Sequence, residues 1–258
     1  SPERRYGRSG RLFLAHDPYR REEASMKLLS LIHNEARKIW RSVVFWVMLG
    51  AFTALPLMIA VFNSSAAHWE AYFADLLGSI GSLLVVGFAF TSAWVFGVEY
   101  TNNTIKDILV KPVPKTYTVL AKFIAIAMWN TGMAVFTFTV IAGAGSLMGV
   151  GGGSIVTILH VFWPFMVASL LIMLISTTSA LIANLTRGYL APIGVIFVIV
   201  IVSNVVVQLG YGPYFPWTIP VLLLTGSELG LISMVILAAT GIAGFAGTVA
   251  WWRFAEHK

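Results

Sequence analysis

The chain alternates long apolar stretches with short polar connections. A helix needs about 20 apolar residues to cross about 30 Å of hydrocarbon, and six stretches reach that length. They predict an all-α membrane protein with six transmembrane helices. The third stretch exceeds one crossing, so we expect it to tilt or to project from the membrane. The predicted spans cover residues 43–62, 74–98, 118–148, 158–185, 190–209 and 231–253.

The basic residues that flank these spans all fall on one side of the predicted bundle. The first, third and fifth connections contain no Lys or Arg. Because cytoplasmic loops are enriched in Lys and Arg, we expect the basic side to be cytoplasmic and to carry both termini. The basic residues of this side are Lys27, Arg37, Lys38, Arg41, Lys106, Lys111, Lys115, Lys122, Arg187, Arg253 and Lys258.

The composition supports the membrane interpretation. Hydrophobic residues make up 58% of the 258 residues and charged residues only 11%, whereas soluble domains contain about a quarter charged residues. A soluble fold could not bury that much apolar surface. The net charge of +6 indicates contact with lipid headgroups rather than nucleic acid, because the cations flank apolar spans.

The region before the first span has two parts. Residues 1–25 carry six arginines and no long apolar run, and we expect a mobile tail or cloning remnant without function, followed by the membrane domain at 26–258. Residues 26–41 have a polar and an apolar face at helical spacing. They predict an amphipathic helix in the headgroup layer; the alternative is an extension of the first span. Its candidate interfacial residues are Lys27, Arg37, Lys38, Trp40 and Arg41.

The connection before the last span, residues 210–230, combines prolines with apolar and aromatic residues. Its apolar part is too short to cross a membrane, and lipid-exposed backbone has to be satisfied by a helix or by packing against protein. We therefore expect a re-entrant or interfacial element on the outer side; the alternative is a packed surface loop. Its candidate residues are Pro216, Trp217 and Pro220.

Sequence motifs of enzyme chemistry are missing. The chain has no G-x-x-x-x-G-K-[ST] motif for ATP, no cysteine, and five scattered histidines. The middle of every predicted span lacks Asp, Glu, Lys and Arg, and Glu99, at the inner end of the second span, is interpreted as an interfacial residue. We therefore expect no catalytic, metal or cofactor site in this chain and no proton relay of its own.

The second connection holds the pattern with the most functional content. Asn102, Asn103 and Thr104 are residue types that cap helix N-termini. Ile105, Ile108 and Leu109 follow at helical spacing, and two prolines, Pro112 and Pro114, end the pattern. The result is a short amphipathic helix on the basic side, tied closely to the second and third spans.

This pattern resembles the permeases of type-2 ABC exporters, in particular the bacterial branch with bacitracin- and lantibiotic-immunity permeases. Many members have Ser-Arg where this chain has Pro114-Lys115. The resemblance covers residues 26–258, since these permeases share the amphipathic start, six spans and a proline-broken outer element. The matching positions are Glu99, Thr104, Ile105, Lys106, Leu109, Pro112, Val113 and Lys115.

The resemblance implies that the short helix is a coupling helix that docks on a separate ATP-binding subunit. Two such ATPases, with ATP and Mg²⁺, would drive two permeases, this chain and a second copy or a homologue, in a bacterial plasma membrane. The expected cargo is hydrophobic or amphipathic, such as an antimicrobial peptide or a lipid-like molecule. The candidate coupling residues are Glu99, Asn103, Thr104, Ile105, Lys106, Ile108, Leu109, Lys111 and Pro112.

Glu99 is expected to brace the coupling helix by pairing with Lys106 or with a basic residue of the N-terminal helix. Other interpretations remain open. One alternative concerns the segment after Glu99, which could be a capped loop lying on headgroups. The other concerns the whole chain, which could be a carrier or channel that works alone, or a membrane enzyme or scaffold of an envelope complex.

Overall fold

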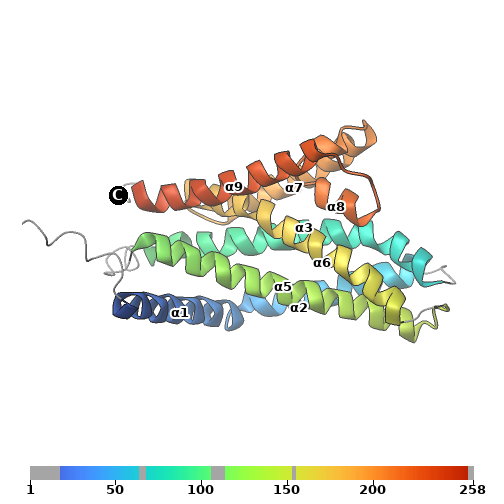
Figure 1. Cartoon of the computed structure of the whole chain (residues 1–258), viewed down its shortest axis with the longest axis horizontal. Coiled ribbons are helices and arrows are strands. Elements are labelled where there is room, and N and C mark those ends of the chain that lie inside the picture. Colours follow the sequence, from blue (N-terminus) through green and yellow to red (C-terminus); the bar gives the residue numbers. More distant parts are fainter. Residues whose placement is uncertain (1–17, 64–67, 106–113, 153–154, 255–258) are drawn as a thin grey trace, which may run out of the picture.

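The computed structural model describes residues 18–63, 68–105, 114–152 and 155–254, which form helices (Figure 1). An isolated bridge between His68 and Gly151 is the only strand-like pairing among them. The elements are α1 (Pro18–Trp40), α2 (Val43–Asn63), α3 (Trp69–Thr101), α5 (Lys115–Leu147), α6 (Ile155–Leu185), α7 (Leu190–Gln208), the short 3₁₀ turn η1 (Gly212–Tyr214), α8 (Ile219–Leu224) and α9 (Leu231–Phe254).

Six of these helices are long and apolar enough to cross a membrane, within the described residues. They are α2, α3, α5, α6, α7 and α9, which confirms all six predicted spans. The largest differences are at α3, which begins at Trp69 and ends at Thr101, and at α5, which begins at Lys115.

Helix α3 lies at the centre of the bundle and packs against α2, α5, α6, α7 and α8 (Figure 1). Small residues allow the closest approaches. At Gly97 of α3, an added Cβ would lie 2.6 Å from the backbone nitrogen of Tyr189, and at Gly244 of α9 it would lie 2.5 Å from that of Thr178. A side chain at either position would push two backbones apart, so Gly97 sets the distance from α3 to the connection between α6 and α7, and Gly244 sets the distance between α9 and α6.

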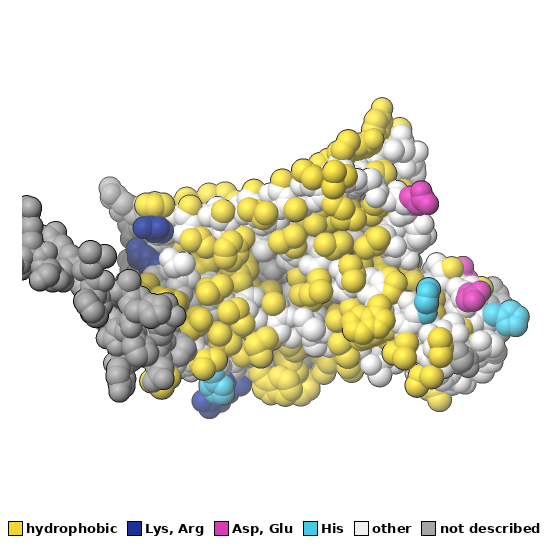
Figure 2. Space-filling view, viewed as in Figure 1, with side chains coloured by type: hydrophobic (Ala, Val, Ile, Leu, Met, Phe, Trp, Pro, Cys, Tyr) yellow, Lys and Arg dark blue, Asp and Glu magenta, His cyan; other side chains and the backbone are white. Residues whose placement is uncertain are grey.

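Charged side chains gather at the two ends of the bundle. On the face shown in Figure 2, basic side chains lie at the end where the chain terminates, acidic side chains lie at the other, and apolar side chains cover most of the surface between them. We call the first the basic end. Helix α3 ends there and α5 begins there (Figure 1).

Helix α1 begins at Pro18, so part of the expected tail, residues 18–25, is helical. It packs against the first half of α5, and a turn at Arg41 and Ser42 separates it from α2 (Figure 1). This geometry resembles the alternative considered above, an extension that leads into the first span. Its depth relative to lipid headgroups stays a prediction.

The element before the last span folds back onto the bundle. Helix α8 has six residues, about 9 Å of rise, and packs against α3 and α6. Pro220 is buried, and Pro216 and Trp217 are half-buried. The segment is therefore too short to cross and is largely shielded by protein. Its re-entrant or interfacial position relative to lipid stays a prediction.

Candidate functional site

The last turn of α3 ends in a local structure that its two asparagines define. Asn103 has a φ of 56°, a left-handed conformation that Asn adopts more readily than most residues. The backbone nitrogen of Thr104 donates to the carbonyl of Glu99 over 3.0 Å, and that of Asn103 to the carbonyl of Tyr100 over 3.2 Å. This is a Schellman motif, so Asn103 caps the C-terminus of α3. The sequence interpretation had grouped it with N-cap residue types and did not foresee this role.

The Glu99 carboxylate belongs to a closed ring of four charged side chains. Lys122 of α5 lies 2.6 Å from Glu99 and 2.9 Å from Glu35 of α1. Lys38 of α1 lies 2.7 Å from Glu35 and 3.2 Å from Glu99. The ring contains two positive and two negative groups and connects three helices, α1, α3 and α5.

Three of the four ring members are buried in the protein. Lys122 is 0% exposed and Glu99 is 3% exposed. The Lys122 ammonium uses all three of its protons, because it also donates to the carbonyl of Val95 over 3.4 Å. A buried charge costs several kcal/mol unless it is paired, so removing one member would leave its partners uncompensated.

Electrostatics keep the Glu35 carboxylate ionised. Burial raises the pKa of Glu35, but the ammonium groups of Lys122 and Lys38 outweigh burial and hold it below the ordinary value of 4.5. On Glu99, Oε1 accepts both ammonium groups, whereas Oε2 has no hydrogen-bond partner among the residues that the structure describes. The ring therefore holds the ionised Glu35 carboxylate in a fixed position.

The next residue, Tyr100, is held on the opposite side of α3. Its hydroxyl donates to Oδ1 of Asn184 on α6 over 3.1 Å and accepts from Nε1 of Trp251 on α9 over 3.2 Å. Trp252 Nε1 also donates to Asn184 Oδ1 over 2.7 Å, and Asn184 Nδ2 donates to the carbonyl of Ala180 over 2.7 Å. Two consecutive residues of α3 thus fix its last turn to α1, α5, α6 and α9.

The structure places only part of the predicted coupling segment. Glu99, Asn103, Thr104 and Ile105 are described, and Ile105 is buried in the same apolar cluster as Ile39 of α1. The predicted pairing of Glu99 with a basic residue of the N-terminal helix is present, with Lys38. The remaining predicted residues lie outside the described residues: Lys106, Ile108, Leu109, Lys111 and Pro112.

Sequence reasoning missed several features of this site. It placed Lys122 among the residues of the basic side and interpreted Glu99 as interfacial, but both are buried. It did not single out Glu35 or Asn184. One signal was available: Lys122 lies inside the predicted span 118–148, where an ionisable residue is costly and requires a partner. The partners themselves could not be named, since they lie 23 and 87 residues away in sequence.

The predicted interfacial residues of α1 behave differently from one another. Lys27, Arg37, Lys38, Trp40 and Arg41 are all exposed. Only Lys38 belongs to the ring, and its side chain remains 54% exposed while its ammonium reaches inward. Arg37 and Trp40 line a surface hollow instead.

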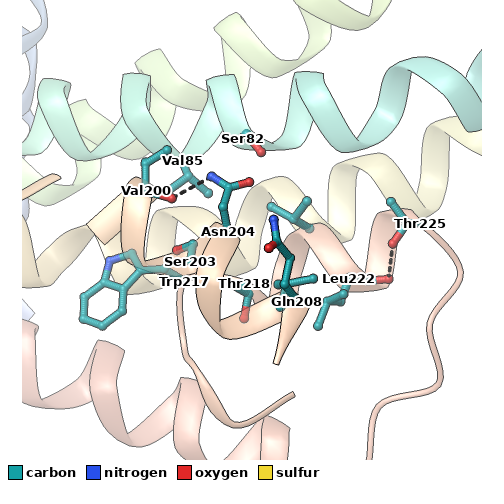
Figure 3. A pocket seen from close by; sticks show the side chains of 12 residues that line it. Ser82, Val85, Val200, Ser203, Asn204, Gln208, Trp217, Thr218, Leu222 and Thr225 are labelled. Carbon is teal, nitrogen blue, oxygen red and sulfur yellow. Dashed lines mark hydrogen bonds between the residues drawn. The ribbon is translucent and has the colours of Figure 1, made fainter. Parts of the chain in front are cut away.

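A second candidate site lies farther along α3, towards the other end of the bundle. A pocket of about 290 Å³ is enclosed by α3, α7 and the segment that contains α8. Figure 3 shows the amide side chains of Asn204 and Gln208 reaching from α7 into this space, near Ser82 of α3. Trp217 and Thr218 line it from the other side. Among the described residues, none that lines the pocket is ionisable, so it suits an uncharged group with apolar and hydrogen-bonding parts.

Six apolar spans around these two sites define a multi-pass membrane protein. The family model of the ABC-2 family transporter proteins matches residues 31–203, and the chain belongs to this family. It is also similar to the bacitracin transport permease protein of Bacillus licheniformis, with 22% identity over 166 residues that cover 63% of this chain and 80% of that protein. The protein is therefore a membrane subunit of an ABC transporter.

Proposed function

We propose that this chain is the permease subunit of an ABC exporter and that ATP is hydrolysed on a separate cytoplasmic subunit. Two such ATPases, each with ATP and Mg²⁺, would act on two permeases, this chain and a second copy or a homologue. The basic end would face the cytoplasm of a bacterial plasma membrane, with both termini there. One observation carries the proposal: the last turn of α3, next to the predicted coupling segment, is fixed to four other helices.

A displacement of the coupling segment would reach α3 through Thr104. Its backbone nitrogen and its Oγ1 both lie within hydrogen-bond distance of the Glu99 carbonyl, at 3.0 and 3.4 Å. Ile105, the following residue, is buried. A displacement of this segment therefore acts directly on the residue whose carboxylate joins the ionic ring.

The ring makes the attached helices move together. Sliding α3 past α1 or α5 would separate Glu99 from Lys38 and Lys122 inside the protein, at a cost of about 3–5 kcal/mol for an unpaired buried charge. Moving the helix ends as one unit avoids that cost. The ring thus acts as a rigid joint between the coupling segment and the spans.

The same helix reaches the pocket. Glu99 and Ser82 both belong to α3, and the helical rise places them about 25 Å apart along the axis. The facing helix α7 is held loosely, since only Pro192 and Ile196 of it are buried. A movement of α3 relative to α7 would therefore change the shape of the pocket that lies between them.

The pocket indicates the kind of cargo. Its volume of about 290 Å³ is at the lower limit of ligand pockets, about 300–1,000 Å³, so it would hold part of a larger molecule. Its neutral amides and hydroxyls suit the uncharged part of an amphipathic cargo, such as an antimicrobial peptide or a lipid-like molecule. Bacitracin, which names the related permease, is the first compound to test.

The test combines co-purification with a matched pair of substitutions on α3. The full chain is purified with its ATPase, placed in lipid nanodiscs, and assayed for ATPase stimulation by bacitracin. Glu99→Gln should reduce the stimulation about tenfold, the equivalent of about 1.4 kcal/mol of coupling. Glu70→Gln, an exposed position in the first turn of the same helix, should leave it unchanged.

Two results would contradict the proposal: unchanged coupling in Glu99→Gln, or transport by the isolated chain along an ion gradient without ATP. The second result would favour a stand-alone carrier. A proton-coupled carrier needs a carboxyl group that gains and loses a proton near neutral pH. The lowered pKa of Glu35 opposes that role for this carboxylate. Catalytic turnover by the isolated chain would favour the enzyme interpretation.

A further inference from the structure

An apolar groove of about 480 Å³ lies between α1, the start of α2 and α5. Aromatic rings form part of its wall: the Phe45 ring lies 4.5 Å from Trp40 and 4.7 Å from Trp129, between centroids. Met128 and Gly132 line it from α5. Trp40 and Met128 are 63% and 60% exposed, so the groove opens to the outside of the chain, where a membrane protein meets lipid.

Basic residues lie beside this groove. A second hollow of about 400 Å³ is lined by His33, Ala36, Arg37 and Trp40, and it shares Ala36 and Trp40 with the groove. The two hollows therefore adjoin each other. Arg41 lies one helical turn after Arg37, since its backbone nitrogen donates to the Arg37 carbonyl over 3.1 Å, and it is exposed.

The two arginines are available to a ligand. Within the described part of the chain, neither Arg37 nor Arg41 forms an ion pair, and the nearby carboxylate of Glu35 is occupied by Lys38 and Lys122. Two positive charges without an ion-pair partner among the described residues therefore lie beside the apolar groove, Arg37 in the wall of the adjoining hollow and Arg41 one helical turn away. This combination matches a molecule with an anionic head and a long apolar chain.

We propose that the groove binds an anionic phospholipid, with one acyl chain between α1 and α5 and the phosphate held by Arg37 and Arg41. Guanidinium groups bind phosphate through paired hydrogen bonds. Basic pockets between helices on the cytoplasmic side are suited to anionic headgroups, and Trp40 occupies the level between head and chain, where tryptophan is favoured. A phosphatidylcholine headgroup fits less well, because its choline cation meets two arginines and no free carboxylate.

The bound lipid strengthens the packing of α1. The acyl chain contacts the apolar sides of both α1 and α5, whereas the ionic ring joins the same two helices through Lys122 and Glu35. The lipid site is thus a second connection between α1 and α5, and it is independent of the ATPase partner proposed above.

Binding is measured by native mass spectrometry of the full chain in detergent, titrated with dioleoyl phosphatidylglycerol or dioleoyl phosphatidylcholine. The unmodified chain should retain phosphatidylglycerol more strongly. Arg37→Gln with Arg41→Gln should weaken phosphatidylglycerol binding about 30-fold, from about 1 kcal/mol per basic residue. The matched control is Arg187→Gln with Arg253→Gln, two exposed arginines elsewhere at the basic end, which should retain binding.

The groove itself is tested by filling it. A Cβ at Gly132 would meet nothing within 4 Å, so Gly132→Phe should occupy the groove without displacing a helix and remove the bound lipid. Gly143 of the same helix has the same open surroundings but does not line the groove, so Gly143→Phe is the control. Gly132→Leu is a smaller filler if the Phe variant fails to fold, as judged by circular dichroism.

Three results would overturn the proposal. Equal retention of phosphatidylglycerol and phosphatidylcholine would show that the arginines do not select an anionic headgroup. Equal losses in the control variants would mean that lipid binds all around the bundle. Competition by glycerol 3-phosphate, which has no acyl chain, would place binding at the arginines alone and exclude the groove.

Discussion

Polar side chains in two regions of α3 are used in opposite ways. At its last turn, Glu99 and Tyr100 meet charged and polar groups of four other helices, and every one of these contacts has a partner of complementary chemistry. Around Ser82, the amides of Asn204 and Gln208 are exposed, and Asn204 donates only to Val200 of its own helix. The first region has one low-energy arrangement, whereas the second leaves its hydrogen-bonding groups available.

The difference follows from the cost of buried charge. An ionic ring tolerates little change in geometry, because each separated pair exposes an uncompensated charge to a low dielectric. Neutral amides and hydroxyls beside a loosely packed helix accept many partners at small cost. Under the proposed function, the rigid end would transmit the movement of a separate ATPase subunit, and the adaptable region farther along the same helix would bind cargo.

The largest expected effect comes from breaking the ring. Lys122→Met leaves Glu35 and Glu99 without their shared ammonium and should lower the free energy of unfolding by about 3–5 kcal/mol. Thermal unfolding of the purified chain in detergent measures this loss. Lys115→Met, at the partly exposed start of the same helix, should change it little; equal losses in both variants would contradict the special role of the ring.

A smaller loss is expected from the other side of the last turn. Asn184→Leu removes the acceptor of Tyr100 and Trp252 and leaves buried donors unpaired, which should cost about 2–3 kcal/mol. The readout is again the unfolding temperature. Stability equal to that of the unmodified chain would show that these hydrogen bonds do not hold α3, α6 and α9 together.

Acidification tests the ring through one carboxylate. Because the folded-state pKa of Glu35 is lowered, its ionised form contributes stability above the ordinary value of 4.5, and that stability is lost as the pH falls through the lowered value. When the pH is lowered from neutral to below 4.5, the free energy of unfolding of the Glu35→Gln variant should therefore fall less than that of the unmodified chain. Glu70→Gln, an exposed control, should keep the original pH profile; identical profiles for all three proteins would refute the expectation.

The smallest effect on stability is expected at the pocket. Asn204→Leu changes an exposed amide and should shift the free energy of unfolding by no more than about 0.5 kcal/mol, while reducing ATPase stimulation by the cargo. It is the counterpart of Asn184→Leu, since both remove an asparagine side chain. A loss of stability as large as that of Asn184→Leu would erase the contrast between the two regions.

The six spans were predictable because crossing a membrane is a local requirement. Each span needs a continuous apolar run of sufficient length, and such runs are visible without knowledge of their neighbours. The proline-broken element before α9 was recognisable for the same reason. The cap of α3 was harder, because Asn favours both helix starts and left-handed helix ends, and the sequence interpretation considered only the first role for Asn103.

By itself, then, the amino-acid sequence determined the number of spans, the concentration of basic residues on one side and the resemblance to type-2 ABC permeases. Only the tertiary structure decided that Lys122 is buried, that Glu35 and Lys38 complete its ring, and that Asn184 holds Tyr100. The physical reason is distance along the chain. Apolar length is encoded in consecutive residues, whereas a buried charge is stable only through partners that folding brings from other helices.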